Sequence, residues 1–195
     1  SLTTAATDMI AVTASGTFTG ASGVTALNTL AGKTAGVVTA TVSGTASELG
    51  DLVIATTDAI AMTASGTQTG SSGVTAVNAL GTATAGVVTA TLTGTITELG
   101  SLSTAATDMI AVTASGTQTG SAGVTAVNAL AGKTAGVVTA TLTGTITELG
   151  SLTTAATDMI AVTASGTQTG SSGVTALNTL AGKTAGVVTA TVSGT

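Results

Sequence analysis

Strict alternation of apolar and polar residues marks one nine-residue segment of the chain, Val37–Thr45. Val38, Ala40 and Val42 occupy every second position, and Thr or Ser fills most of the positions between them. This period of two is typical of a β-strand with one buried face. The segment returns at Val87–Thr95, Val137–Thr145 and Val187–Thr195, a period of 50 residues.

A second nine-residue segment, Met9–Thr17, has the same pattern. Ile10, Val12 and Ala14 share one side of it, and it returns at Ala59, Met109 and Met159. The two segments match position by position, and both end in Ser/Thr-Gly-Thr. We therefore expect Met9–Thr17 and Val37–Thr45 to form equivalent, stacked strands, with a turn at each glycine.

This self-similarity predicts a repeat solenoid. The chain forms one unit, 1–195, with repeats at 1–50, 51–100, 101–150 and 151–195 and with neither end capped. Each repeat splits into half-repeats of 28 and 22 residues, which indicates two coils per repeat. The predicted fold is a parallel β-solenoid with short helical turns in its connections. The alternative is an α/β solenoid of the leucine-rich-repeat kind, whose units have about 20–29 residues.

The connections contain helix signals. A T-x-x-E capping box, in which Thr and Glu side chains satisfy free amides at a helix start, occurs in three copies. Its residues are Thr45 with Glu48, Thr95 with Glu98, and Thr145 with Glu148. The longer connection, Ser22–Gly32, places Val24, Leu27 and Leu30 on one helical face, so we expect a helix packed on the inward side of the sheet.

Two sets of polar residues are candidate structural ladders. Stacked strands align Thr39 and Thr41, Thr89 and Thr91, and Thr139 and Thr141 into Thr columns on the outward face. Asn28, Asn78, Asn128 and Asn178 form a second column, which we expect to hydrogen-bond backbone groups.

Composition argues against an enzyme. The chain has no His and no Cys, which the usual nucleophilic mechanisms require. Paired carboxylates occur only once, as Glu48 and Asp51, because Ser replaces the aspartate in later copies. Helix capping is the favoured role for Glu48. We predict no catalytic residue, no cofactor site and no metal site.

Calcium is disfavoured as a ligand. Asp8, Asp58, Asp108 and Asp158 form one column, but two coils separate neighbours, about 10 Å at 4.8 Å per strand. Carboxylates that far apart do not share an ion held at about 2.5 Å. We interpret them as residues at strand starts that bond nearby amides.

Charge restricts the partners. The net charge is −5, and three Lys are the only cations, which argues against nucleic acid and anionic membranes. No apolar run is long enough to insert into a membrane. The expected partner is a further copy of the chain, joined end to end or laterally.

One motif resembles a known class of repeats. Thr34–Thr41 and Ser43–Leu49 are similar to repeats of giant cell-surface and secreted proteins of bacteria, notably marine cyanobacteria, with the forms T-T-G-V-V-D-A-T and T-G-T-A-A-E-L. The resemblance implies a very long extracellular protein with a structural or adhesive role. Thr39 stands where that pattern often has Asp, which weakens any calcium-binding role carried with it.

These observations favour a non-enzymatic structural protein at the cell surface or outside the cell. The leading hypothesis is a fibre, filament or surface layer formed by end-to-end stacking of coils. The alternatives are a rigid stalk of a large adhesin and a module whose Thr array binds ice or another surface.

Overall fold

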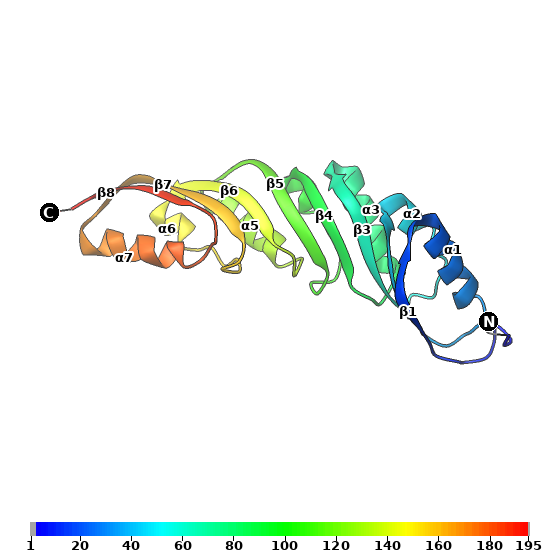
Figure 1. Cartoon of the computed structure of the whole chain (residues 1–195). Helices are drawn as coiled ribbons and strands as arrows, with labels where there is room; N and C mark the ends of the chain where they lie inside the picture. Colours follow the sequence, from blue (N-terminus) through cyan, green and yellow to red (C-terminus); the bar gives the residue numbers. More distant parts are fainter. Residues whose placement is uncertain (1–2, 195) are drawn as a thin grey trace.

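Eight parallel strands form a single sheet in sequence order, β1 to β8 (Figure 1). The structure is a computed structural model that describes residues 3–194. The strands are β1 Val12–Thr19, β2 Val38–Thr45, β3 Ala59–Thr69, β4 Val88–Thr95, β5 Met109–Thr119, β6 Val138–Thr145, β7 Met159–Thr169 and β8 Val188–Ser193. One strand per coil and two coils per repeat confirm the parallel solenoid.

Helices of two lengths alternate in the connections. The long helices are α1 Gly20–Ala31, α3 Gly70–Ala83, α5 Gly120–Ala131 and α7 Gly170–Ala181. The short helices are α2 Ala46–Gly50, α4 Ile96–Leu99 and α6 Ile146–Leu149. All of them pack on one face of the sheet, so every coil consists of a strand and a helical connection.

Packing distances explain the alternation. Neighbouring strands are about 4.8 Å apart, whereas packed helices need about 8–10 Å between their axes. A long helix on every coil would therefore be too crowded. A long helix on every second coil has a spacing of about 9.6 Å, which meets the requirement. This is the physical reason why two different coils, and not one, make up the repeat.

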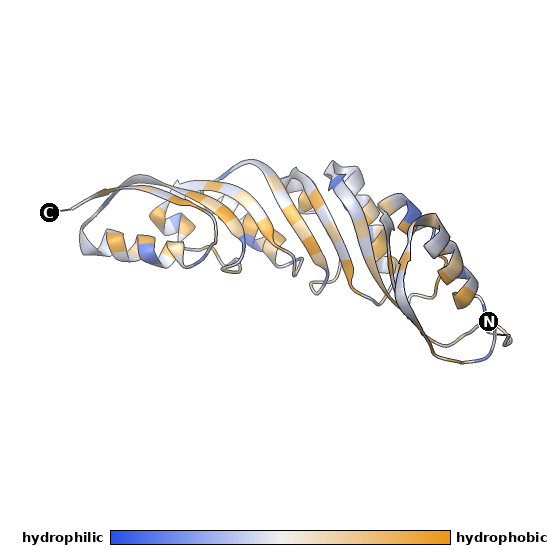
Figure 2. Cartoon of the chain, viewed as in Figure 1, coloured by the Kyte–Doolittle hydropathy of each residue, from blue (hydrophilic) through white to orange (hydrophobic). Residues whose placement is uncertain are grey.

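The core lies between the sheet and the helices. Val38, Ala40 and Val42 point inward from β2 and are at most 5% exposed, as the alternation predicts. From β3, Ile60 and Met62 point the same way and are at most 1% exposed. The helices add Val24 and Leu27 from α1, Val74, Val77 and Leu80 from α3, and Val124, Val127 and Leu130 from α5. Apolar and weakly polar blocks alternate along the strands in Figure 2.

The strand register differs from the sequence prediction by two residues. Aligning the two nine-residue segments pairs Ala59 with Val37, but Ala59 lies opposite Thr39. In addition, the register between β1 and β2 shifts at a bulge between Thr13 and Thr17, and β1 continues to Thr19. Because the offset between aligned positions is an even number, the inward and outward faces are still assigned correctly.

The bulge accounts for the first glycine of each repeat. Gly16 has a φ of 86°, a left-handed value that favours glycine, and Gly66, Gly116 and Gly166 repeat it. Gly44, in contrast, lies inside β2 opposite Ala64, so it does not turn the chain away as its sequence position suggested.

The solenoid is an elongated, twisted ribbon with its two ends far apart (Figure 1). The helices cover one side along its length, and the other side of the sheet has no covering layer in the part of the chain that the structure describes.

Candidate functional surface

The three capping boxes are present at the carboxyl ends of β2, β4 and β6. In the first, the Thr45 amide and hydroxyl donate to Glu48 Oε2 at 2.7 and 2.9 Å, and the Glu48 amide donates to Thr45 Oγ1 at 3.2 Å. Thr95 with Glu98 and Thr145 with Glu148 repeat the arrangement. Each box starts a short helix immediately after a strand.

These hydrogen bonds favour the ionised carboxylate. The pKa of Glu48 is lowered from its ordinary value, chiefly because the Thr45 backbone amide donates to it and secondly because the Thr45 hydroxyl does. The same causes lower the pKa of Glu98 and of Glu148. All three carboxylates are therefore ionised caps at neutral pH.

The Asn column connects successive coils. Asn28 Nδ2 donates to the Asp51 carbonyl at 3.0 Å, and the Val53 amide donates to Asn28 Oδ1 at 2.8 Å. The equivalent pairs are Asn78 with Ser101 and Ser103, and Asn128 with Ser151 and Thr153. Asn178 holds the same position on α7. These amides bond the backbone of the next coil, which is the role expected of them.

The Asp column also connects backbone segments. Asp58 is 3% exposed, and its carboxylate accepts from the Val38 amide at 2.7 Å and from the Ala55 amide at 3.0 Å. Its own carbonyl accepts from the Ala85 amide at 2.9 Å. Asp108 and Asp158 repeat these contacts. Each buried carboxylate therefore connects the strand start of the preceding coil to its own turn.

A buried Thr beside each Asp was missed by the sequence analysis. Thr84 Oγ1 accepts from the Ile60 and Gly86 amides, both at 2.9 Å, and lies 2.9 Å from the Asp58 carbonyl. Thr34, Thr134 and Thr184 have equivalent contacts. The signal that could have revealed it is the tripeptide Thr-Ala-Gly, which is unchanged in all four copies.

Two lysines also bond between coils. Lys133 Nζ donates to the Leu102 carbonyl at 2.8 Å, and Lys183 Nζ donates to the Gly150 and Leu152 carbonyls at 2.9 and 2.8 Å. Their targets lie just after the short helices α4 and α6. These lysines therefore satisfy carbonyls of an earlier connection, 31 to 33 residues back.

The Thr columns occupy the open face of the sheet. One register line runs Thr69, Thr93, Thr113, Thr139 and ends at Met159. A second kind of line has three residues, Thr, Thr and Ala, and recurs in each repeat. Its members are Thr17, Thr41 and Ala61, then Thr67, Thr91 and Ala111, then Thr117, Thr141 and Ala161. Thr39, Thr89 and Thr139 also lie on this face, beside buried valines.

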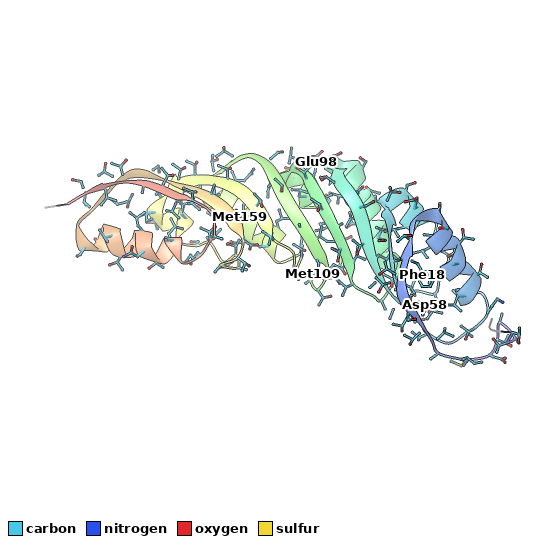
Figure 3. All side chains as sticks on the ribbon, viewed as in Figure 1. Phe18, Asp58, Glu98, Met109 and Met159 are labelled. Atoms are coloured by element: carbon cyan, nitrogen blue, oxygen red, sulfur yellow. The ribbon has the colours of Figure 1, made fainter. Side chains whose placement is uncertain are left out.

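An apolar border runs along the strand-start edge of the same face. We call it the Val–Met margin, and its residues are Val37, Val87, Met109, Val137 and Met159, which are 41–50% exposed. Each precedes a buried residue of a strand, such as Val38 or Ile110, so by alternation its side chain points to the open face. Met109 and the capping residue Glu98 lie at opposite ends of the strands (Figure 3).

The open face carries no charge. None of the residues in β1 to β8 is acidic or basic. The buried aspartates are bonded to backbone amides, and Glu98 Oε1 faces Ser71, in the first turn of α3, on the helix side. The face therefore consists of Thr, Ser and Ala with an apolar border.

Two shallow hollows lie between coils on the connection side. One, of about 400 Å³, is bordered by Asn28, Gly32, Gly36, Ile54 and Asp58. The other, of about 320 Å³, is bordered by Asn128, Gly132, Gly136 and Asp158, the equivalent residues of the third and fourth copies. Both are lined by small side chains and backbone. Within residues 3–194, no three His, Cys, Asp or Glu side chains gather where they could hold a metal ion.

Comparisons with protein-family models, with curated proteins and with solved structures find no match to this chain. Among the described residues, no helix combines the length and apolarity that crossing a bilayer requires. The geometry of the chain itself is therefore the basis for a functional proposal.

Proposed function

We propose that the chain is a non-enzymatic structural protein whose coils stack end to end into rods or filaments at the cell surface or outside the cell. The observation that carries this proposal is that equivalent core positions recur from coil to coil, so each coil presents the surface that a further coil, of the same copy or of another, fits. Val174 is 44% exposed, whereas Val24, Val74 and Val124, at the same position of earlier coils, are 2–3% exposed.

The same contrast holds for the last strand. Val192 is 51% exposed, while Val42, Leu92 and Leu142 have no exposed surface. In the earlier copies a following coil covers these positions. The surface that the last coil presents is therefore chemically the inner surface of the solenoid, which a further coil fits.

The first coil presents the complementary surface. Ile10 is 39% exposed, whereas Ile60, Ile110 and Ile160 are fully buried. In addition, β1 and β8 each have one edge without a neighbouring strand among the described residues, and such an edge is a template for pairing with another chain. Pairing β8 of one copy with β1 of the next would continue both the sheet and the core.

The location outside the cell is supported by the resemblance of Thr34–Leu49 to repeats of giant bacterial surface proteins. A structural role is supported by the use of the buried polar groups. Asp58, Thr84 and Asn28 all bond backbone between coils.

Electron microscopy and sedimentation of the 195-residue chain test the proposal. We expect filaments, and we expect Val174→Glu with Val192→Glu to give short, monodisperse rods. Val53→Glu, at a position 77% exposed and away from both ends, is the control and should still form filaments. Monodisperse rods of the unaltered chain at all concentrations would favour the rigid stalk instead.

A second candidate is binding of ice or another ordered surface, favoured by the uncharged Thr lines of the open face. The twist of the sheet opposes it, because the Thr rows turn along the solenoid (Figure 1). Thermal hysteresis measured on the rods decides this point, and freezing that is indistinguishable from buffer would remove the candidate.

A further inference from the structure

The open face of the sheet is the most unusual surface of the molecule. Parallel sheets occur almost only with both faces covered, because their strands are joined by connections that pack on them. Here every helix packs on the same face, and the opposite face is exposed over all eight strands. Its Val–Met margin adds five large apolar side chains that are 41–50% exposed.

We infer that this face binds the same face of a second copy, forming a two-layer pair of sheets with the solenoids side by side. End stacking uses the first and last coils, whereas this contact uses the surface perpendicular to them. The inference names a second interface for a self-assembling structural protein, and it does not require the end contacts.

Charge favours a second copy as the occupant. The chain has a net charge of −5, so two copies repel each other wherever their carboxylates approach. The eight strands contain no charged residue, and the Glu98 carboxylate lies against α3 on the covered side. The open face is therefore where two identical acidic chains can approach with the least repulsion.

The available area is sufficient for a stable pair. Eight strands about 4.8 Å apart, each about seven residues long at 3.3 Å per residue, give a face of roughly 900 Å². Full overlap of two faces would bury about 1,800 Å², and overlap of about two thirds would bury about 1,200 Å², within the range of specific interfaces. Twisted sheets of the same hand pack in this manner in β-sandwiches, about 10 Å apart.

The position of the Val–Met margin selects the orientation. In a two-fold pair the same patch of each copy meets its equivalent. A two-fold axis parallel to the strands brings the two strand-start edges together, so margin packs on margin. An axis across the strands would place Met109 over the opposite, strand-end edge, near the capping boxes. We therefore place the axis parallel to the strands.

The largest overlap puts this axis between β4 and β5, the middle strands of the sheet. In that arrangement β4 of one copy crosses β5 of the other. Val87, just before β4, then lies near Met109 of the second copy. Thr91 and Thr113, both exposed on the open face, lie further along the same two strands.

Added charge at the centre of the face tests the inference. The background is the Val174→Glu, Val192→Glu chain, in which end stacking is blocked. We expect this protein to sediment as a dimer, and we expect Thr91→Glu with Thr113→Glu to make it a monomer, because four carboxylates would meet near the axis. Ala79→Glu with Ala129→Glu is the matched control on α3 and α5, and it should remain a dimer.

Cross-linking reports the orientation without changing the charge of the face. The chain contains no cysteine, so Met109→Cys and Val87→Cys each introduce a single thiol. Mixed and oxidised, the two variants should form a disulfide-linked pair far faster than Ala79→Cys, a control on the helix side. Equal cross-linking rates would overturn the proposed axis.

The outcomes separate this inference from the proposed function. If the unaltered chain forms no filaments but the dimer and its loss in Thr91→Glu, Thr113→Glu are observed, end stacking fails and the face contact stands. If the end-blocked chain is a monomer at every concentration, the face contact is wrong, whether or not the unaltered chain forms filaments. Binding of ice or of a polysaccharide by that monomer would assign the face to another occupant.

Discussion

At the scale of single residues, the fold depends on polar groups buried at the starts of the strands. The Asp58 carboxylate, the Thr84 hydroxyl and the backbone around Gly86 form one hydrogen-bonded unit. Unpaired backbone amides in this position would cost about 1–3 kcal/mol each. The same unit recurs with Asp108 and Thr134 and with Asp158 and Thr184.

Gly86→Ala tests the packing of this unit. A methyl group at position 86 would overlap the backbone carbon and oxygen of Ile60 in the neighbouring strand. Backbone cannot move aside as a flexible side chain can, so we expect a loss of about 2–3 kcal/mol in the free energy of unfolding. Urea denaturation followed by circular dichroism measures it.

Gly50→Ala is the control for this substitution. No heavy atom lies within 4 Å of a methyl group at position 50, and the residue belongs to the helix α2. Ala is a better helix former than Gly, so the variant should be at least as stable as the parent chain. Equal stability of Gly86→Ala and Gly50→Ala would show that the sheet can yield at this contact.

The sequence predicts residue roles well where a pattern is local. The capping boxes have a four-residue signature, and the alternation of Val38, Ala40 and Val42 identifies the buried face. The Thr84 unit was missed because its partners, Asp58 and Ile60, lie 24 to 26 residues away, and no local pattern indicates such a distance. Likewise, the reach of Lys183 to Leu152 depends on stacking that only the structure shows.

At the scale of elements, the two kinds of coil differ because of helix size. The sequence predicted two coils per repeat and a helix at Ser22–Gly32, and the structure places α1 at Gly20–Ala31. The register between the strands was wrong by two residues even between β2 and β3, where it is continuous, and the bulge at Gly16 adds a further shift between β1 and β2. The alternation of apolar and polar residues determines which face of the sheet a side chain occupies. It does not determine the pairing register to within two residues, because a shift of two residues leaves every side chain on the same face.

The second repeat differs from the first and fourth in one contact between connections, which is apolar instead of polar. In the first and fourth copies, Thr4 and Thr154 donate to the carbonyls of Lys33 and Lys183. The second repeat has Ile54 and Ala83 at these positions, and both are partly buried against the core. A polar contact and an apolar contact therefore occupy the same place in the solenoid.

The capping boxes predict how stability depends on pH. The pKa values of Glu48, Glu98 and Glu148 are lowered in the folded protein, chiefly by the backbone amides of Thr45, Thr95 and Thr145. Their contribution is fully present above the ordinary glutamate pKa of about 4.3, and it is lost as the pH falls through the lowered values. Thermal melts between pH 7 and pH 2 should show this decline.

The triple variant Glu48→Gln, Glu98→Gln, Glu148→Gln isolates the effect. Glutamine can still complete a capping box but does not titrate, so the variant should fold and should lose less stability between pH 5 and pH 2. Parallel curves for the parent chain and the triple variant would mean that other carboxylates cause the acid sensitivity.

At the scale of the whole molecule, the repeat of 50 residues is the smallest unit that can be added or removed. Deleting 51–100 joins Gly50 to Ser101, which reproduces the Gly-Ser junction found at Gly150 and Ser151. The deletion places β2 beside β5, and β2 has the sequence pattern of β4, the normal neighbour of β5. We expect a folded six-stranded chain.

The change in the m-value of unfolding follows from the buried surface that the deleted repeat no longer contributes. In a solenoid each repeat contacts only its neighbours, so the denaturant dependence should scale with the number of repeats. Removing 50 of the 195 residues should lower the m-value by about a quarter while the melt remains cooperative. Urea titration of both chains measures this change.

A deletion of about half that length tests whether the alternation of coils matters. Removing 46–69 deletes α2 and β3, so β2 would lie beside β4 and the long helices α1 and α3 would follow on adjacent coils. Their axes would then be held near 4.8 Å apart, although packed helices need about 8–10 Å. We expect this shorter deletion to abolish cooperative unfolding, even though it removes fewer residues than the deletion of 51–100. A cooperative melt for both deletions would contradict the explanation of the 50-residue period by helix spacing, because a single coil would then be sufficient as the repeating unit.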